Sequence, residues 1–117
     1  MYYKDLEVWK KSIELVKEIY SISLEFPKGE QFGLISQIKR AVISIPSNIA
    51  EGTAIYSDKD TSRFIDIALG SVAEVETQII IAQELGYIKD TENIENLLRQ
   101  ENALLIGFKK YIDKSKT

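Results

Sequence analysis

The acid–base chemistry open to this chain falls to carboxylates such as those of Glu51 and Glu74, because the 117 residues include no histidine and no cysteine. Without imidazole or thiol groups the chain lacks the usual general base, the thiolate nucleophile, disulfides and the common zinc ligands. The Glu-x-x-His pairs of di-iron bundles are absent, as is a phosphate-binding glycine loop. We therefore expect no enzyme, with no catalytic residue, no cofactor-binding residue and no metal site.

The two glutamates belong to rows of polar and small residues that recur every three or four positions in two stretches of the chain. If these stretches are neighbouring antiparallel helices, one register places Glu51 opposite Arg63 and Arg40 opposite Glu74, because both pairs of residue numbers have the same sum. The same register brings Ser44 against Gly70. The alternative is that these residues face solvent separately and that the shared sum is a coincidence. The predicted polar seam consists of Gln37, Arg40, Ser44, Pro46, Asn48 and Glu51 in the first stretch, and of Arg63, Gly70, Ser71 and Glu74 in the second.

Pro46 lies inside the first of these stretches, where the surrounding pattern is helical. A proline in a helix removes one backbone hydrogen bond and costs roughly 3 kcal/mol or more. We interpret Pro46 as the site of a kink in a long helix. Side chains of the polar seam are expected to bond the carbonyl that the proline leaves free.

Four amphipathic stretches cover almost the whole sequence, at about residues 5–24, 29–52, 58–85 and 90–114. Each carries apolar residues at alternating spacings of three and four, as on one face of a helix. No sustained strand pattern with hairpin signals occurs. Short connections make consecutive helices antiparallel. The sequence thus predicts an all-α fold, an antiparallel up-down-up-down four-helix bundle that forms a single domain over residues 1–117.

The expected boundaries of the helices rest on capping residues. Asp5 and Ser57 are predicted N-caps, the latter with Asp60 three residues on, and Gly52 and Gly86 are predicted stops. The expected core stripe of the first helix is Leu6, Trp9, Ile13, Val16 and Tyr20.

The third stretch is apolar on more than one side, which distinguishes it from the others. Besides its main stripe it carries a second, narrower one with Leu69, Ala73 and Ile80, about 100° or more around the axis. A helix that is apolar nearly all round must be covered nearly all round. We expect another subunit to cover this side, so Leu69, Ala73 and Ile80 are the candidate residues of an oligomer interface.

The net charge of −3 gives the chain no overall attraction to nucleic acid. The N-terminus does not resemble a signal peptide, and no uncharged apolar stretch approaches the roughly 20 residues that cross a bilayer. We expect a cytoplasmic protein that has no membrane partner.

Three segments make the sequence resemble a known family: "DLEVWKKS", "FPKGEQFGLISQIKRAVISIPSNIAEG" and "RFIDIALGSVAEVETQIIIAQELGYI". They are similar to the four-helix-bundle proteins encoded in 23S ribosomal RNA intervening sequences, over about residues 3–112. The resemblance implies an up-down bundle that assembles as a ring-like homopentamer. The family is related to the accessory variability-determinant proteins of diversity-generating retroelements, which bind a reverse transcriptase and nucleic acid through a basic surface.

Two functions remain open from the sequence. One is a non-catalytic scaffold or adaptor, whose first partner is a further copy of itself, by resemblance a pentamer. The other is an RNA- or DNA-binding module, acting on nucleic acid or with a nucleic-acid-processing protein, in which the ring multiplies lysine patches. The candidate nucleic-acid contacts are Lys10, Lys11, Lys109, Lys110, Lys114 and Lys116. The competing interpretation of the C-terminal lysines is that they complement the negative end of a helix dipole.

Overall fold

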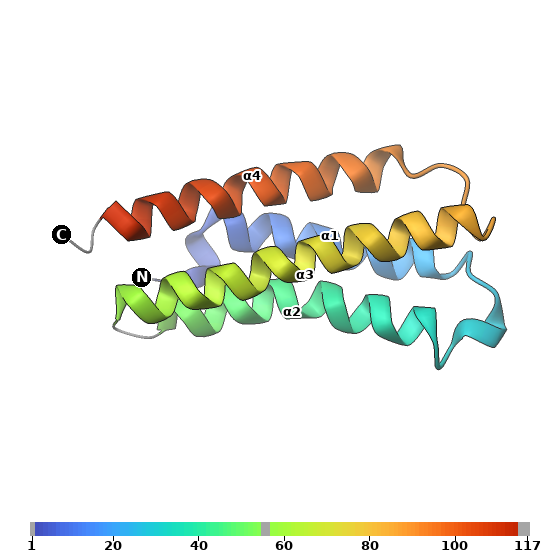
Figure 1. Ribbon diagram of the computed structural model, residues 1–117, viewed down its shortest axis with the longest axis horizontal. Coiled ribbons are helices and arrows are strands. Elements are labelled where there is room, and N and C mark those ends of the chain that lie inside the picture. Colours follow the sequence, from blue (N-terminus) through green and yellow to red (C-terminus); the bar gives the residue numbers. More distant parts are fainter. Residues whose placement is uncertain (1, 55–56, 115–117) are drawn as a thin grey trace.

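The computed structural model describes residues 2–54 and 57–114, and every regular element in them is helical. The long helices are α1 (Glu7–Ser23), α2 (Leu34–Ala54), α3 (Asp58–Glu84) and α4 (Glu92–Lys114), and the short 3-10 turns are η1 (Tyr3–Asp5) and η2 (Lys28–Glu30). Successive helices run in opposite directions, and both ends of the chain lie at the same end of an elongated bundle (Figure 1), which measures 49 × 24 × 20 Å. The predicted all-α four-helix bundle is confirmed.

Each long helix contributes one apolar stripe to a common core. Burying one such leucine or isoleucine side chain stabilises the fold by roughly 1.5–3 kcal/mol. The stripes of α2, α3 and α4 follow the predicted periodicity, whereas that of α1 is rotated relative to the prediction. The largest fully buried apolar side chains are Leu15, Ile19, Ile38, Val42, Ile45, Ile49, Ile65, Ile79, Ile94, Leu98 and Leu105.

The predicted stripe of α1 lies at the edge of the buried face. Leu6, Trp9 and Val16 are partly buried and pack against the core, while Tyr20 is 38% exposed. The centre of the face is formed by Leu15 and Ile19 instead. Because α1 is apolar over a wide arc, two neighbouring stripes satisfy the same spacing rule, and only the positions of the other helices select between them.

The N-terminal boundaries of α1 and α2 differ from the predictions. Asp5 belongs to the turn η1, and the N-cap of α1 is Leu6, whose side chain makes no capping hydrogen bond. The segment that begins at Gly29 does not start α2, because Lys28–Glu30 folds as the separate turn η2 and the helix begins at Leu34. The side chain of Glu30 caps this later start, since its Oε1 accepts a hydrogen bond from the Leu34 N–H at 3.2 Å.

Gly52 is not a helix stop, since α2 continues to Ala54. A Cβ atom at this position would lie 2.7 Å from the Cβ of Phe64 and 3.4 Å from the carbonyl oxygen of Thr61. Both of these residues belong to α3, so the absence of a side chain at Gly52 lets the end of α2 approach the start of α3 closely. Because the helices are this close, the hydroxyl of Thr61 donates a hydrogen bond to the Gly52 carbonyl at 2.7 Å.

The predicted caps of α3 are confirmed. The Ser57 side chain accepts a hydrogen bond from the Asp60 N–H at 3.4 Å. At the other end Gly86 has a φ of 78°. The Tyr87 N–H donates to the Ala82 carbonyl at 2.9 Å and the Gly86 N–H donates to the Gln83 carbonyl at 3.0 Å, which is the Schellman arrangement that ends a helix.

The two connections at the far end of the bundle are joined by the side chains of Tyr87 and Glu30. The Tyr87 hydroxyl donates to Glu30 Oε2 at 2.7 Å, and the Tyr87 ring packs near that of Phe26, with centroids 5.9 Å apart. This hydrogen bond is the leading cause that lowers the pKa of Glu30 and raises the pKa of Tyr87. The α1–α2 connection is therefore fixed against the α3–α4 connection.

Among the described residues, no helix combines the length and the low charge that crossing a bilayer requires.

Candidate functional site

The polar seam between α2 and α3 is joined through hydroxyl groups. Ser44 Oγ and Ser71 Oγ form a hydrogen bond to each other. The two helices lie antiparallel and side by side (Figure 1) and share the largest contact of any pair in the bundle. The sequence placed Ser44 opposite Gly70, so the predicted register differs from the observed one by a single residue. Gly70 itself is open, because a Cβ there would meet nothing within 4 Å.

The charged residues of the seam are arranged differently from the expectation. Arg40 and Glu74 line one surface hollow of about 350 Å³ together with Gln37, Ala41 and Ser44. The ion pairs found among residues 2–54 and 57–114 include neither Arg40 with Glu74 nor Glu51 with Arg63. All four side chains are exposed, and the Arg63 guanidinium stacks over the neighbouring Phe64 ring at 4.7 Å. Hydroxyls rather than ion pairs therefore connect α2 to α3.

Pro46 is buried, and α2 passes through it without ending. The backbone carbonyl that loses its usual partner is that of Val42, four residues earlier. Side chains of the seam do donate to backbone carbonyls here, but the acceptors are the carbonyls of Ala41 and Ser44 rather than that of Val42. Ser44 Oγ donates to the Ala41 carbonyl at 3.0 Å, and Asn48 Nδ2 donates to the Ser44 carbonyl at 2.7 Å.

Glu101 is a buried acidic residue that the sequence prediction missed. It lies in the core stripe of α4 with 0% of its surface exposed, and neither carboxylate oxygen has a hydrogen-bond partner. Burial raises its pKa to about 9, against a smaller opposing effect of the Lys11 charge. Glu101 is therefore an uncharged acid at neutral pH. Its position between Leu98 and Leu105, at spacings of three and four, was the available signal.

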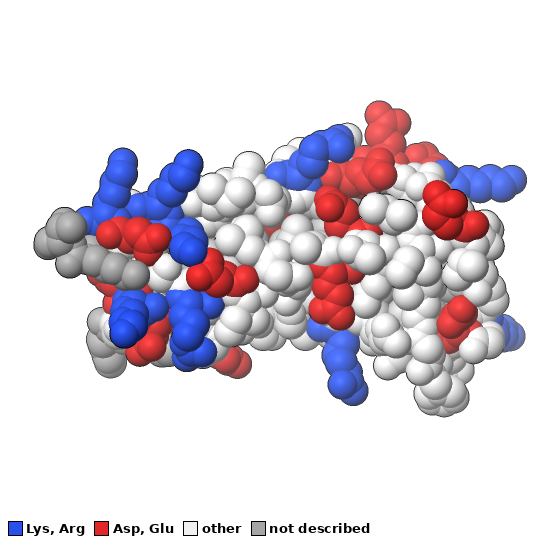
Figure 2. All heavy atoms as spheres, viewed as in Figure 1, with Lys and Arg blue, Asp and Glu red and all other residues white. Residues whose placement is uncertain are grey.

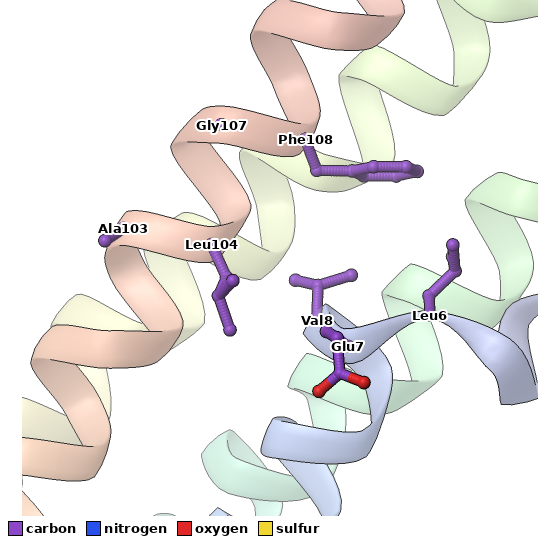
Figure 3. A pocket seen from close by; sticks show the side chains of 7 residues that line it. All are labelled: Leu6, Glu7, Val8, Ala103, Leu104, Gly107 and Phe108. Atoms are coloured by element: carbon purple, nitrogen blue, oxygen red, sulfur yellow. The ribbon is translucent and has the colours of Figure 1, made fainter.

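Beside the start of α1, an apolar hollow of about 300 Å³ is lined by residues of this helix and of α4 (Figure 3). Its walls are mainly apolar side chains, and Glu7 is its one charged residue. Figure 3 shows Val8 and Leu104 pointing toward one another, while Phe108 extends from α4 toward the Leu6 side of the hollow. The lining residues are Leu6, Glu7, Val8, Ala103, Leu104, Gly107 and Phe108.

The candidate interface residues on the outer side of α3 differ in how far they are exposed to solvent. Ala73 and Ile80 are exposed, Ile80 by 49%, whereas Leu69 is half-buried against the core. Ala73 also lines a hollow of about 360 Å³ between α3 and α4, which Ile106 lines from the α4 side. In Figure 2 charged side chains gather near the C-terminal end, and the neighbouring stretch over α3 shows few. The exposed isoleucines that the sequence prediction did not name are Ile43, Ile67, Ile81 and Ile106.

Several candidate nucleic-acid lysines lie beside carboxylates. Lys10 is 3.8 Å from Glu7, Lys11 is 3.2 Å from Glu14, and Lys109 pairs with Asp66 across α3 and α4. The hydrogen bond that Lys109 donates to the Asp66 carboxylate is the leading cause that raises the pKa of Lys109. Lys110 and Lys114 are exposed. Lys116 falls outside the described residues.

The described residues also contain no cluster of three or more acidic side chains arranged to hold a metal ion.

Comparison with known proteins identifies the family. The family model described as 23S rRNA-intervening sequence protein matches residues 4–107. The chain belongs to this family. A solved structure with the same fold is a protein of unknown function of the S23 ribosomal protein family from Bacteroides thetaiotaomicron, which is 28% identical to this chain, with a TM-score of 0.81. The match covers 94% of this chain and 99% of the other. No curated protein matches the chain.

Proposed function

We propose that this protein is a non-catalytic scaffold that assembles with further copies of itself, as a pentamer by family resemblance. The observation that carries the proposal is the exposed apolar side of α3. Ala73 and Ile80 lie there, and Ile67 and Ile81, which are each 43% exposed, lie further round the same helix. Exposed apolar side chains along one helix of a small domain support an association surface there.

The chemistry of the chain supports a non-catalytic role. The carboxylate with the most perturbed pKa, Glu101, is enclosed in the core, where no substrate reaches it. Glu51 and Glu74 are exposed side chains on the surface of α2 and α3. A cytoplasmic location stays a prediction.

Light scattering coupled to gel filtration tests the proposal. The mass of one chain is 13.3 kDa. We expect the wild-type protein to elute as a multiple of this mass, five chains if the family assembly applies. Ala73→Asp and Ile80→Asp each place a charge on the apolar side of α3, and both are expected to lower the mass toward that of one chain.

Ser21→Asp is the matched control, because Ser21 is exposed on α1 and the change introduces the same charge. It is expected to leave the mass unchanged. A wild-type mass of one chain at every concentration would rule out self-assembly. An unchanged mass in both α3 variants would place the association surface elsewhere.

A further inference from the structure

The connection between α1 and α2 carries the two most exposed large apolar side chains among the described residues. Phe32 is 92% exposed and Leu24 is 85% exposed. This segment is at the end of the bundle opposite to the two chain termini (Figure 1). It is not loosely held, because Glu30 bonds both Tyr87 and the start of α2. A fixed turn that holds apolar side chains in water is typical of a contact surface.

A hollow of about 310 Å³ lies beside these side chains. The buried Phe26 and the half-buried Ile35 supply its apolar floor, and Leu24 forms part of its wall. Lys28, Lys39 and Gln31 also line it, as does Ser23. The hollow is therefore apolar inside and carries two positive charges around its opening.

The positive charge of this hollow is not balanced by acids of the chain. Neither Lys28 nor Lys39 takes part in an ion pair among the described residues, and the Lys39 ammonium lies over the Tyr20 ring, 4.6 Å from its centroid. The acid of the adjacent turn, Glu30, is committed to the Tyr87 hydroxyl and to the Leu34 N–H. No acidic residue lines the hollow, although the chain as a whole has a net charge of −3.

We propose that this surface binds an acidic amphipathic segment of a partner protein, with one bulky apolar side chain in the hollow and flanking carboxylates facing Lys28 and Lys39. Apolar contact supplies the affinity, and the two lysines select for the sign of the partner's charge. This surface lies on α1, α2 and their connection, whereas the proposed self-assembly uses α3, so both interactions can coexist.

The experiment is a titration of the ¹⁵N-labelled full chain with two synthetic helical peptides of matched design. The first has leucine on one face and glutamate on the other, and the second has lysine in place of each glutamate. We expect the acidic peptide to shift the backbone amide signals of Leu24, Ile35 and Lys39. It is expected to bind on the order of tenfold more tightly than the basic peptide.

Variants separate the two contributions. Lys39→Glu is expected to weaken binding of the acidic peptide on the order of tenfold and to strengthen binding of the basic peptide. Lys59→Glu is the control, because Lys59 is an exposed lysine at the start of α3, and it is expected to leave both affinities unchanged. Leu24→Ser is expected to weaken the binding of both peptides. It is expected to leave folding unaffected, because Leu24 is already 85% exposed.

Three outcomes overturn the proposal. One is equal affinity for the two peptides, and another is a set of shifted signals that lies away from the hollow. The third is a lower assembly mass of Leu24→Ser or Phe32→Ser in light scattering, which assigns the surface to a second copy of the chain. A monomeric wild-type protein that still binds the acidic peptide would refute self-assembly and leave this surface intact.

Discussion

The Ser44–Ser71 contact between α2 and α3 and the Glu101 site on α4 treat their polar groups in opposite ways. Between α2 and α3, the hydroxyls of Ser44 and Ser71 bond each other, and nearby side chains bond backbone carbonyls. On the α4 side of the core, Glu101 is wholly enclosed and has no hydrogen-bond partner. Small hydroxyls satisfy one another at little cost, whereas an unpaired carboxyl is tolerated only in its uncharged form.

This difference shows which site fixes the arrangement of the bundle and which one makes its stability depend on pH. The Ser44–Ser71 hydrogen bond requires one register of α2 against α3. The Glu101 carboxyl specifies no partner, and it ties the stability of the fold to the binding of a proton. Substitutions at the two sites are therefore expected to differ in both size and pH dependence.

Glu101 gives the largest expected effect. Its pKa is about 9 in the folded chain and 4.5 as a free side chain, so the folded state retains a proton that the unfolded state releases. The contribution of Glu101 to the free energy of unfolding is therefore expected to fall by about 1.4 kcal/mol per pH unit between pH 5 and pH 9, and to be highest below pH 4.5. Glu101→Leu is expected to remove this slope and to be the more stable protein at pH 8.

Urea unfolding at several pH values measures this slope. Glu84→Leu is the control, since Glu84 is exposed on α3 and its loss is expected to leave the slope in place. A wild-type slope equal to that of Glu101→Leu would show that the buried carboxyl is already ionised at neutral pH.

Gly52 and Gly70 give the next largest effect, and they make a matched pair on the α2–α3 side. Gly52→Ala places a Cβ 2.7 Å from Phe64 and is expected to destabilise the fold by about 1–3 kcal/mol. Gly70→Ala meets open space inside a helix and is expected to stabilise it by up to about 1 kcal/mol. Thermal unfolding of the two variants measures both, and a stable Gly52→Ala protein would mean that the two helices are not in close approach.

The hydroxyl pair is expected to contribute less. Ser44→Ala and Ser71→Ala should each cost about 1 kcal/mol, because each removes the hydrogen bond between the helices, although the remaining hydroxyl still bonds a carbonyl of its own helix. The double variant is expected to cost less than the sum of the two single changes. A double-mutant cycle measures this coupling, and strict additivity would show that the two hydroxyls do not interact.

Lys11 gives the smallest expected effect. Its charge lowers the pKa of Glu101 against the larger effect of burial. Lys11→Gln is therefore expected to raise the pKa of Glu101 further, by a small amount, because interactions of partly exposed charges are weak. The midpoint of the stability slope on its alkaline side reports the change, and a lower midpoint would contradict the assignment.

The sequence predicted the parts of the fold that depend on local periodicity. The four helices, the caps of α3 and the α2–α3 register to within one residue all follow from spacings along the chain. The core stripe of α1 was misplaced, because Leu15 and Leu6 both satisfy the helical spacing and only the neighbouring helices decide between them. Gly52 was read as a stop, although its role is set by Phe64 on another helix.

The candidate sites were less predictable, because they depend on contacts between distant segments. The sequence does not indicate Glu101 as a core residue, since glutamate is almost never fully buried without a partner. The bond between Glu30 and Tyr87 joins two connections that are far apart in the sequence, and no local pattern indicates it. The ion pairs of Arg40 and Glu51 were predicted from charge sign and register alone, which do not fix where long side chains point.

A ¹³C NMR titration of the Glu101 side-chain carboxyl tests most directly whether the core holds an uncharged acid. The signal is assigned by its absence in Glu101→Leu, and exposed glutamates such as Glu84 serve as internal references. The structure predicts a midpoint at about pH 9, so the carboxyl remains protonated at neutral pH. A midpoint close to 4.5, together with a fold that stays intact, would contradict it.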